Sequence, residues 1–306
     1  MLARFYREPL TLDDQSRASL SARTDMPGQF INLPNSVEHA AVTHYELTGP
    51  EDGPVVVLVH GLSTPLFLWN PTVPALVAAG YRVLRYDLFG RGFSDRPRVK
   101  SDIALFRGQL LSLLDALDLT APVDVVGISM GGMIAVDFCD QHPDRVRKLA
   151  LIDPAGYPMK ATLGVILLFL PGIGEALMAL NGDKLILAGL PKDFLQPRRY
   201  ADYYEQYRKQ LPYQGFKRSL LSTIRNMPFS GAMEPVYQRV GQQDRPKLLL
   251  WGREDRTIPF ALHEQVQAAL PGVEFHAIDE AAHLPHYEQP AVVNPILVRF
   301  LEDGIV

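Results

Sequence analysis

The chain has 306 residues, of which 47% are hydrophobic and 21% are charged, and its formal net charge is -4. These values suit a soluble globular protein with one large α/β domain and an insertion, and the absence of a basic cluster argues against nucleic acid as a partner. Cys139 is the only cysteine, so an internal disulfide framework is excluded.

The N-terminal stretch up to about Met26 is polar. Within it, the run from Thr11 to Asp14 resembles a capping box before a short helix, and the stretch is interpreted as an arm that packs on the body or on a partner. The first residues contain no long apolar run, so no signal peptide is expected. A cytoplasmic location is therefore the default prediction.

From about Gln29 to Gly156, apolar runs with β-like composition alternate with helix-like stretches. This alternation is typical of a parallel sheet that helices cover on both faces. The runs predict strands near 55–59, 82–86, 123–127 and 149–152. The first of these runs ends in His60-Gly61 and delivers a loop to the carboxyl edge of the sheet. We interpret His60 as a residue that fixes the shape of this loop.

The pattern Gly127-x-Ser129-x-Gly131 lies where an apolar strand turns directly into a helix. Such a turn forces the serine into a strained conformation above the sheet, and the glycines let the neighbouring backbone pass. The helix that follows points its N–H groups toward the same place. Ser129 is therefore a candidate nucleophile, and the backbone N–H groups of Leu62 and Met130 are candidate donors to an oxyanion.

More chain lies between the strand that ends at Asp153 and the strand that begins at Lys247 than one crossover needs. We interpret the excess, residues 157–233, as a helical cap on a core of residues 1–156 and 234–306, with 1–28 as the arm. The apolar run 161–180 is interrupted by Pro171, Gly172 and Gly174, which argues against a bilayer-spanning helix. Its apolar residues either pack on the core, line an acyl pocket or touch lipid transiently.

An acid and a histidine follow the last two predicted strands. Asp255, in the turn after Trp251-Gly252, is the candidate acid that orients the histidine, and Asp153 is the rival. His283 is the candidate general base. His286 forms an H-x-x-H pair with it, but the loop lacks the helical spacing and the cysteines of common zinc sites, so we expect no metal.

Nucleophile, acid and histidine in this chain order, together with the motifs below, resemble the α/β-hydrolase fold family. The motifs are His60-Gly61, Tyr86-Asp87 through Ser94-Asp95, Gly127 through Gly132, Gly252 through Asp255, and Ala282-His283. The resemblance covers nearly all residues from about Gln29 onward. It implies a mostly parallel sheet with helices on both faces and a helical cap insertion, and a serine hydrolase without a cofactor.

By this resemblance, Ser129 is the nucleophile, Asp255 the acid, His283 the base, and Leu62 and Met130 the oxyanion donors. The expected substrates are small-molecule carboxylic esters of medium chain length or monoacylglycerol type. Two alternatives stay open: a carbon–carbon bond, lactone or thioester hydrolase with the same triad, and a weakly catalytic ligand receptor. The sequence does not determine the natural substrate or the oligomeric state.

Overall fold

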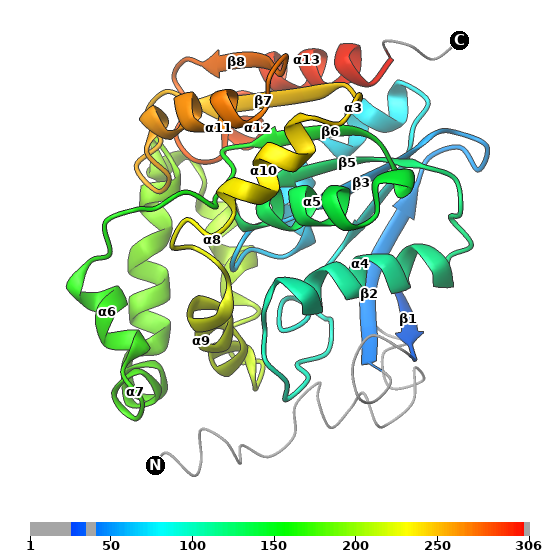
Figure 1. Ribbon diagram of the computed structural model, residues 1–306. Coiled ribbons are helices and arrows are strands. Elements are labelled where there is room, and N and C mark those ends of the chain that lie inside the picture. The colour runs from blue at the N-terminus through cyan, green and yellow to red at the C-terminus, as the bar shows by residue number, and fades with distance from the viewer. Residues whose placement is uncertain (1–25, 35–40, 303–306) are drawn as a thin grey trace.

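The structure, a computed structural model, describes residues 26–34 and 41–302 of the chain. Its centre is an eight-stranded sheet in the order β1-β2-β4-β3-β5-β6-β7-β8 (Figure 1). The strands are β1 (Gln29–Leu33), β2 (Ala41–Thr48), β3 (Val55–Val59), β4 (Arg82–Tyr86), β5 (Val123–Ile128), β6 (Val146–Ile152), β7 (Lys247–Gly252) and β8 (Glu274–Ile278).

The four strands predicted in the first half of the chain are confirmed as β3 to β6, and strands β3 to β8 pair in parallel. Strands β1 and β2 are different, because β1 pairs antiparallel with β2 and β2 pairs antiparallel with β4. The connection between β1 and β2 is too short for the crossover of a dozen or more residues that a parallel pair requires. The sheet is therefore mostly parallel, as predicted.

Helices cover both faces of the sheet. Successive side chains of a strand point to opposite sides, so apolar strands give the sheet two apolar faces. Val57, Val125 and Leu149 face one helical layer, while Val56, Val126 and Ala150 face the other. The first layer contains α4 (Ile103–Ala116), α5 (Met130–Gln141), α10 (Glu234–Gly241) and α11 (His263–Ala269). The second contains α3 (Val73–Ala78), α12 (Pro285–Glu288) and α13 (Pro290–Glu302).

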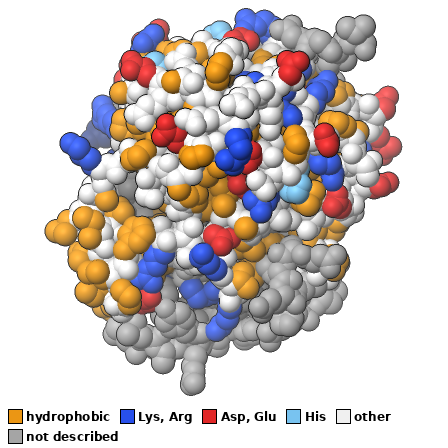
Figure 2. Space-filling view, in the orientation of Figure 1, with side chains coloured by type: hydrophobic (Ala, Val, Ile, Leu, Met, Phe, Trp, Pro, Cys, Tyr) orange, Lys and Arg blue, Asp and Glu red, His pale blue; other side chains and the backbone are white. Residues whose placement is uncertain are grey.

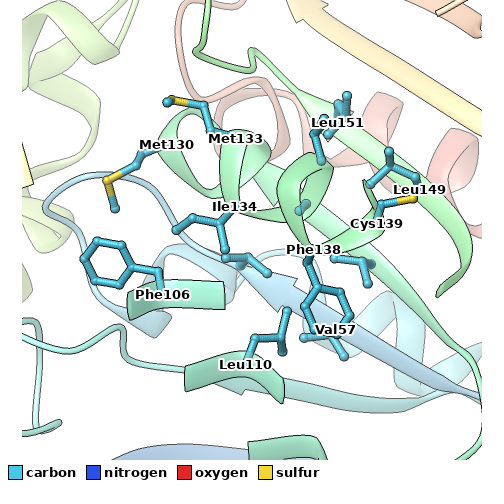
Figure 3. Close-up of a cluster of buried hydrophobic side chains, with 14 of the residues drawn as sticks. Val57, Phe106, Leu110, Met130, Met133, Ile134, Phe138, Cys139, Leu149 and Leu151 are labelled. Atoms are coloured by element: carbon cyan, nitrogen blue, oxygen red, sulfur yellow. The ribbon is translucent and has the colours of Figure 1, made fainter. Parts of the chain in front are cut away.

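Helix α5 is the most deeply buried helix of the first layer. Met133 and Phe138 are completely buried, and they belong with Cys139 to one hydrophobic cluster (Figure 3). The Met130 side chain also points into this core beside Phe106. Any role of Met130 in a site at the sheet edge must therefore come from its backbone.

Between β6 and α10 the chain forms four helices, which we call the inserted helices. They are α6 (Leu163–Phe169), α7 (Ile173–Gly189), α8 (Ala201–Arg208) and α9 (Phe216–Asn226). Short 3-10 turns complete the connections of the described chain at η2 (Leu66–Trp69), η3 (Pro143–Arg145), η4 (Leu190–Asp193), η5 (Pro197–Arg199) and η6 (Phe260–Leu262). The boundaries predicted for a cap, 157–233, enclose the inserted helices and stay a prediction.

The apolar run 161–180 is divided between two helices, α6 and α7, at the predicted breakers Pro171 and Gly172. Among the helices of 26–34 and 41–302, none has the length and apolar character needed to cross a membrane. The capping-box sequence 11–14 and nearly all of the predicted arm lie outside the described residues.

Candidate active site

The strand-to-helix turn at Ser129 has the strained geometry that the sequence predicts. Ser129 lies between β5 and α5 with φ 57° and ψ -122°, a left-handed conformation that is unfavourable for a residue with a side chain. Its N–H donates to the Ile152 carbonyl at 3.0 Å, and its own carbonyl accepts from Ala155 N–H at 3.0 Å. These bonds to the end of β6 and the loop after it hold the strained residue in place.

The two glycines of the motif are required for space. A Cβ atom added to Gly127 would lie 2.4 Å from the Gly131 carbonyl oxygen, and one added to Gly131 would lie 2.2 Å from the Val59 carbonyl oxygen. No side chain fits at either position. The motif therefore brings the start of α5 against the end of β3, where the His60-Gly61 loop begins.

The His60-Gly61 loop passes directly beside Ser129. A Cβ atom on Gly61 would lie 3.3 Å from Ser129 Cβ and 3.7 Å from Ser129 Oγ. The bonds of His60 determine its tautomer: Leu88 N–H donates to His60 Nε2 at 2.9 Å, so the ring proton is on Nδ1, which donates to the Gly61 carbonyl at 2.9 Å. Burial lowers the pKa of His60 to about 4, so this ring is neutral.

The bond from His60 orients the peptide that joins Gly61 to Leu62. In a trans peptide the carbonyl and the N–H point in opposite directions, so a Gly61 carbonyl that faces His60 leaves the Leu62 N–H facing away from it. Met130 is the first residue of α5, and its N–H is one of those without a partner inside the helix. Both N–H groups belong to segments that meet at Ser129.

Two side chains to which the sequence analysis assigned no role also hold the loop that begins at His60-Gly61. Arg91 Nε donates to the Leu62 carbonyl at 2.8 Å, and Gln210 Nε2 donates to the Ser63 carbonyl at 2.8 Å. Arg91 is completely buried and lies between the glycines of the Gly90-Arg-Gly92 motif, which was the one sequence signal that pointed to it. Burial lowers the pKa of its guanidinium to about 9.

Arg91 also joins this loop to the inserted helices. Its two terminal nitrogens donate to Ser219 Oγ at 3.2 Å and Thr223 Oγ1 at 2.9 Å, both on α9. Gln210, which follows α8, is likewise buried. The candidate oxyanion donor Leu62 is therefore positioned by contacts that the core and the inserted helices make together.

The candidate base and acid lie together at the same edge of the sheet, on the loops that follow β8 and β7. His283 Nδ1 is 2.8 Å from Asp255 Oδ2, and both side chains are buried. Asp255 Oδ1 accepts from the N–H groups of Thr257 at 2.7 Å and Ile258 at 2.9 Å, which fixes the carboxylate. Because Nδ1–H faces Asp255, Nε2 of the neutral ring is the free basic nitrogen.

Opposing effects act on the pKa of His283. Burial lowers it, but the Asp255 carboxylate raises it by its charge and its hydrogen bond, and the net shift is upward from 6.5. The inserted chain contributes as well: Asp193 on η4 raises the same pKa, and its carbonyl accepts from the His283 N–H at 3.1 Å. The loop that carries His283 is therefore also tied to the inserted segment.

The rival acid Asp153 lies beside Asp255 and does not take its place. Asp153 is completely buried and accepts one hydrogen bond, from Gly252 N–H at 2.9 Å. Burial and the neighbouring Asp255 charge raise its pKa well above the ordinary value, which disfavours the ionised form. The structure pairs His283 with Asp255, and the hydrogen bond that Asp153 accepts comes from the backbone of β7.

His286 does not form a site with His283. Its Nε2 donates to the Leu68 carbonyl at 3.2 Å, its ring packs on Trp69, and burial lowers its pKa to about 3. In the described part of the chain, one group has ligand atoms close enough for a metal, within 4.8 Å of one another: Asp153, Asp255 and His283. The histidine pair singled out in the sequence is therefore not a joint ligand set.

Comparisons with known proteins agree with the fold described above. A model of the alpha/beta hydrolase fold matches residues 54–290. The 2-hydroxy-6-oxononadienedioate/2-hydroxy-6-oxononatrienedioate hydrolase of Paraburkholderia xenovorans is 32% identical over 272 residues, which are 84% of this chain and 90% of that protein.

Two solved structures are similar over most of their length. The enol-lactonase from Burkholderia xenovorans has a TM-score of 0.74 and 25% identity, and the match covers 85% of this chain and 96% of that chain. A thermophilic esterase from Thermogutta terrifontis has a TM-score of 0.77 and 22% identity, with 90% and 98% covered. At that identity, the likeness to the esterase shows the fold alone.

The pairing of His283 predicts that the two aspartates respond differently to the same change. Asp255→Asn should lower kcat by about 10⁴, since the histidine then loses the carboxylate that fixes its tautomer. Asp153→Asn should lower kcat by less than about tenfold, because an amide has nearly the same shape as a carboxyl group and can still accept the hydrogen bond from Gly252 N–H. Steady-state kinetics of both variants measure the difference. A larger loss in Asp153→Asn would identify Asp153 as the acid.

The hydrogen bond from His60 Nδ1 to the Gly61 carbonyl predicts that His60 affects turnover by positioning the Leu62 N–H. His60→Leu should lower kcat by up to about 10², the loss expected when one oxyanion donor is misplaced, while His60→Gln, which keeps a donor near the Gly61 carbonyl, should recover part of it. Thermal unfolding of both variants separates this effect from loss of fold. Equal kcat in the wild type and both variants would show that His60 does not position the Leu62 N–H.

Proposed function

Because the chain belongs to the alpha/beta hydrolase fold family, we propose that it is a serine hydrolase that cleaves carboxylic esters through an acyl-enzyme. The observation that supports this proposal is that the strained Ser129, the His283–Asp255 pair and the oriented Gly61–Leu62 peptide all follow the carboxyl ends of parallel strands in one sheet. Such an arrangement suits attack on a carbonyl carbon.

The proposed reaction uses each group in turn. His283 Nε2 takes the proton of Ser129 Oγ as the oxygen attacks the carbonyl, and Asp255 stabilises the resulting histidine cation. The N–H groups of Leu62 and Met130 donate to the oxyanion of the tetrahedral intermediate. His283 then protonates the leaving alcohol, and a water that it deprotonates hydrolyses the acyl-enzyme.

Apolar surroundings favour an ester with an apolar acyl group. Leu62 packs on the apolar cluster of the inserted helices, to which Met178, Phe216 and Leu220 belong. These contacts place hydrocarbon next to the proposed oxyanion donor, where a medium-length acyl chain would gain about 0.8 kcal/mol per buried methylene. We infer that the inserted helices act as a cap and contribute to acyl selectivity.

Carbon–carbon bond hydrolysis is the second candidate, and a specific observation favours it. The relative from Paraburkholderia xenovorans, at 32% identity, is named for hydrolysis of a 2-hydroxy-6-oxo dienedioate. Its named substrate carries two carboxylates, which calls for cations at the site. The buried Arg91, which donates to the Leu62 carbonyl, is a candidate cation for a substrate carboxylate. It already donates, however, to two carbonyls and two hydroxyls of the protein.

The first expected result concerns Ser129. Wild-type protein should hydrolyse p-nitrophenyl esters with an optimum at medium acyl length, and Ser129→Ala should lower kcat by roughly a million-fold, since the nucleophile is lost. The dienedioate named above is tested in parallel. Turnover of the dienedioate without turnover of esters would favour the second candidate, and a folded protein that turns over neither would favour the ligand receptor.

The pKa of His283 predicts the pH dependence. Only the neutral ring accepts the proton of Ser129, so kcat/KM should fall as pH drops, with the midpoint above 6.5 because the net pKa shift is upward. NMR titration of His283 in Ser129→Ala measures the same pKa without turnover. A profile that is flat between about pH 5 and pH 8 would contradict the role of His283 as the base.

A further inference from the structure

The outer surface of the inserted helices is unusually apolar. All but one of the large hydrophobic side chains that are strongly exposed among the described residues lie between 159 and 185. We call them the apolar patch: Met159, Leu163, Val165, Ile166, Phe169, Leu170, Ile173, Leu180 and Leu185. Figure 2 shows hydrophobic side chains gathered at the lower left, where Figure 1 places α6 and α7.

Helix α6 is the centre of the apolar patch. Six of its seven residues are large and apolar or aromatic, yet none is fully buried, and Leu163 is 71% exposed. Leu167 and Leu168 are its half-buried residues, and Leu168 packs against the apolar cluster of the inserted helices. A contiguous apolar surface of this kind is uncommon on a soluble protein and marks a contact with a partner or a membrane.

The charges around the apolar patch are mainly positive. Lys160, Lys184 and Lys192 are exposed on and beside the helices that carry it. The acids of the same segment are already engaged: Glu175 pairs with Arg225 at 2.5 Å and Asp183 with Lys217 at 3.3 Å. An outward surface with exposed lysines and neutralised acids is complementary to negative charge, although the whole chain carries a net charge of -4.

We propose that the apolar patch docks on the surface of an anionic lipid bilayer. The α6 helix lies in the interface with its aliphatic side chains among the acyl chains, and the three lysines contact the headgroups. The composition fits lipid better than protein, because the patch is aliphatic with one phenylalanine and lacks the Trp, Tyr and Arg anchors of protein interfaces. This proposal does not depend on the reaction proposed above.

Tryptophan fluorescence tests the docking directly. Trp69 and Trp251 are completely buried, so a tryptophan introduced at the surface is the one that responds to added lipid. Phe169→Trp in the full chain should shift its emission to shorter wavelength on vesicles that contain equal parts phosphatidylglycerol and phosphatidylcholine. Val292→Trp, at a comparably exposed site on α13 outside the patch, should not shift.

Co-sedimentation of variants with the same vesicles measures the apolar and the electrostatic contributions to binding separately. The double variant Ile166→Ser with Phe169→Ser should weaken binding at least about tenfold, since the inserted hydrocarbon is lost, and Lys160→Gln should weaken it about fivefold. Val292→Ser is the matched control and should bind like the wild type. Binding should also weaken in high salt and on pure phosphatidylcholine.

Three results would overturn the proposal. The first is equal emission shifts at positions 169 and 292, and the second is no binding of the wild type to anionic vesicles. The third is a wild-type dimer in sedimentation velocity without lipid that the double serine variant converts to a monomer, because the patch would then be covered by a second copy. Thermal unfolding confirms that each variant is folded.

Discussion

The crossing from β5 into α5 is the constraint on which the rest of the structure depends. Ser129 accepts an unfavourable backbone conformation there, and the crossing is possible only because Gly127 and Gly131 leave room for neighbouring carbonyls. The strain costs of order 1–3 kcal/mol, so it must be offset by the packing of α5 and by the bonds from Ser129 to the end of β6 and beyond. As a result, the Ser129 side chain lies above the sheet edge, beside the first N–H groups of α5.

Around this turn, burial acts on the ionisable groups of the site. Burial lowers the pKa of His60 to about 4, and burial together with the Asp255 charge raises the pKa of Asp153 well above its ordinary value. Both shifts favour the uncharged form of a group that bonds to the neighbouring backbone. Arg91 is a buried cation that donates to the Leu62 carbonyl, and in the proposed mechanism its charge favours the negative charge that develops near Leu62.

Sequence analysis predicted the parallel strands and the segments that meet at Ser129, because both depend on local patterns. It left Asp255 and Asp153 as rivals for a physical reason: they follow adjacent strands and lie side by side, so order along the chain does not separate them. It gave Arg91 and Gln210 no role, since the bond of Arg91 to Thr223 and the bond of Gln210 to Ser63 each join residues more than a hundred positions apart in sequence. Such contacts depend on how the inserted helices pack, which no local pattern encodes.

The inserted helices partly invert the usual pattern of a soluble helix, with polar groups inside and apolar groups outside. On α9, Ser219 and Thr223 are buried because Arg91 needs their oxygens, and on α7 Glu175 is buried against Arg225 while Leu180 remains 59% exposed. The hydroxyls of α9 hold Arg91 on the inner side, while the outer side of α6 and α7 is apolar and exposed. Water makes such an exposed apolar surface unfavourable, and this is the physical reason for the membrane docking proposed above.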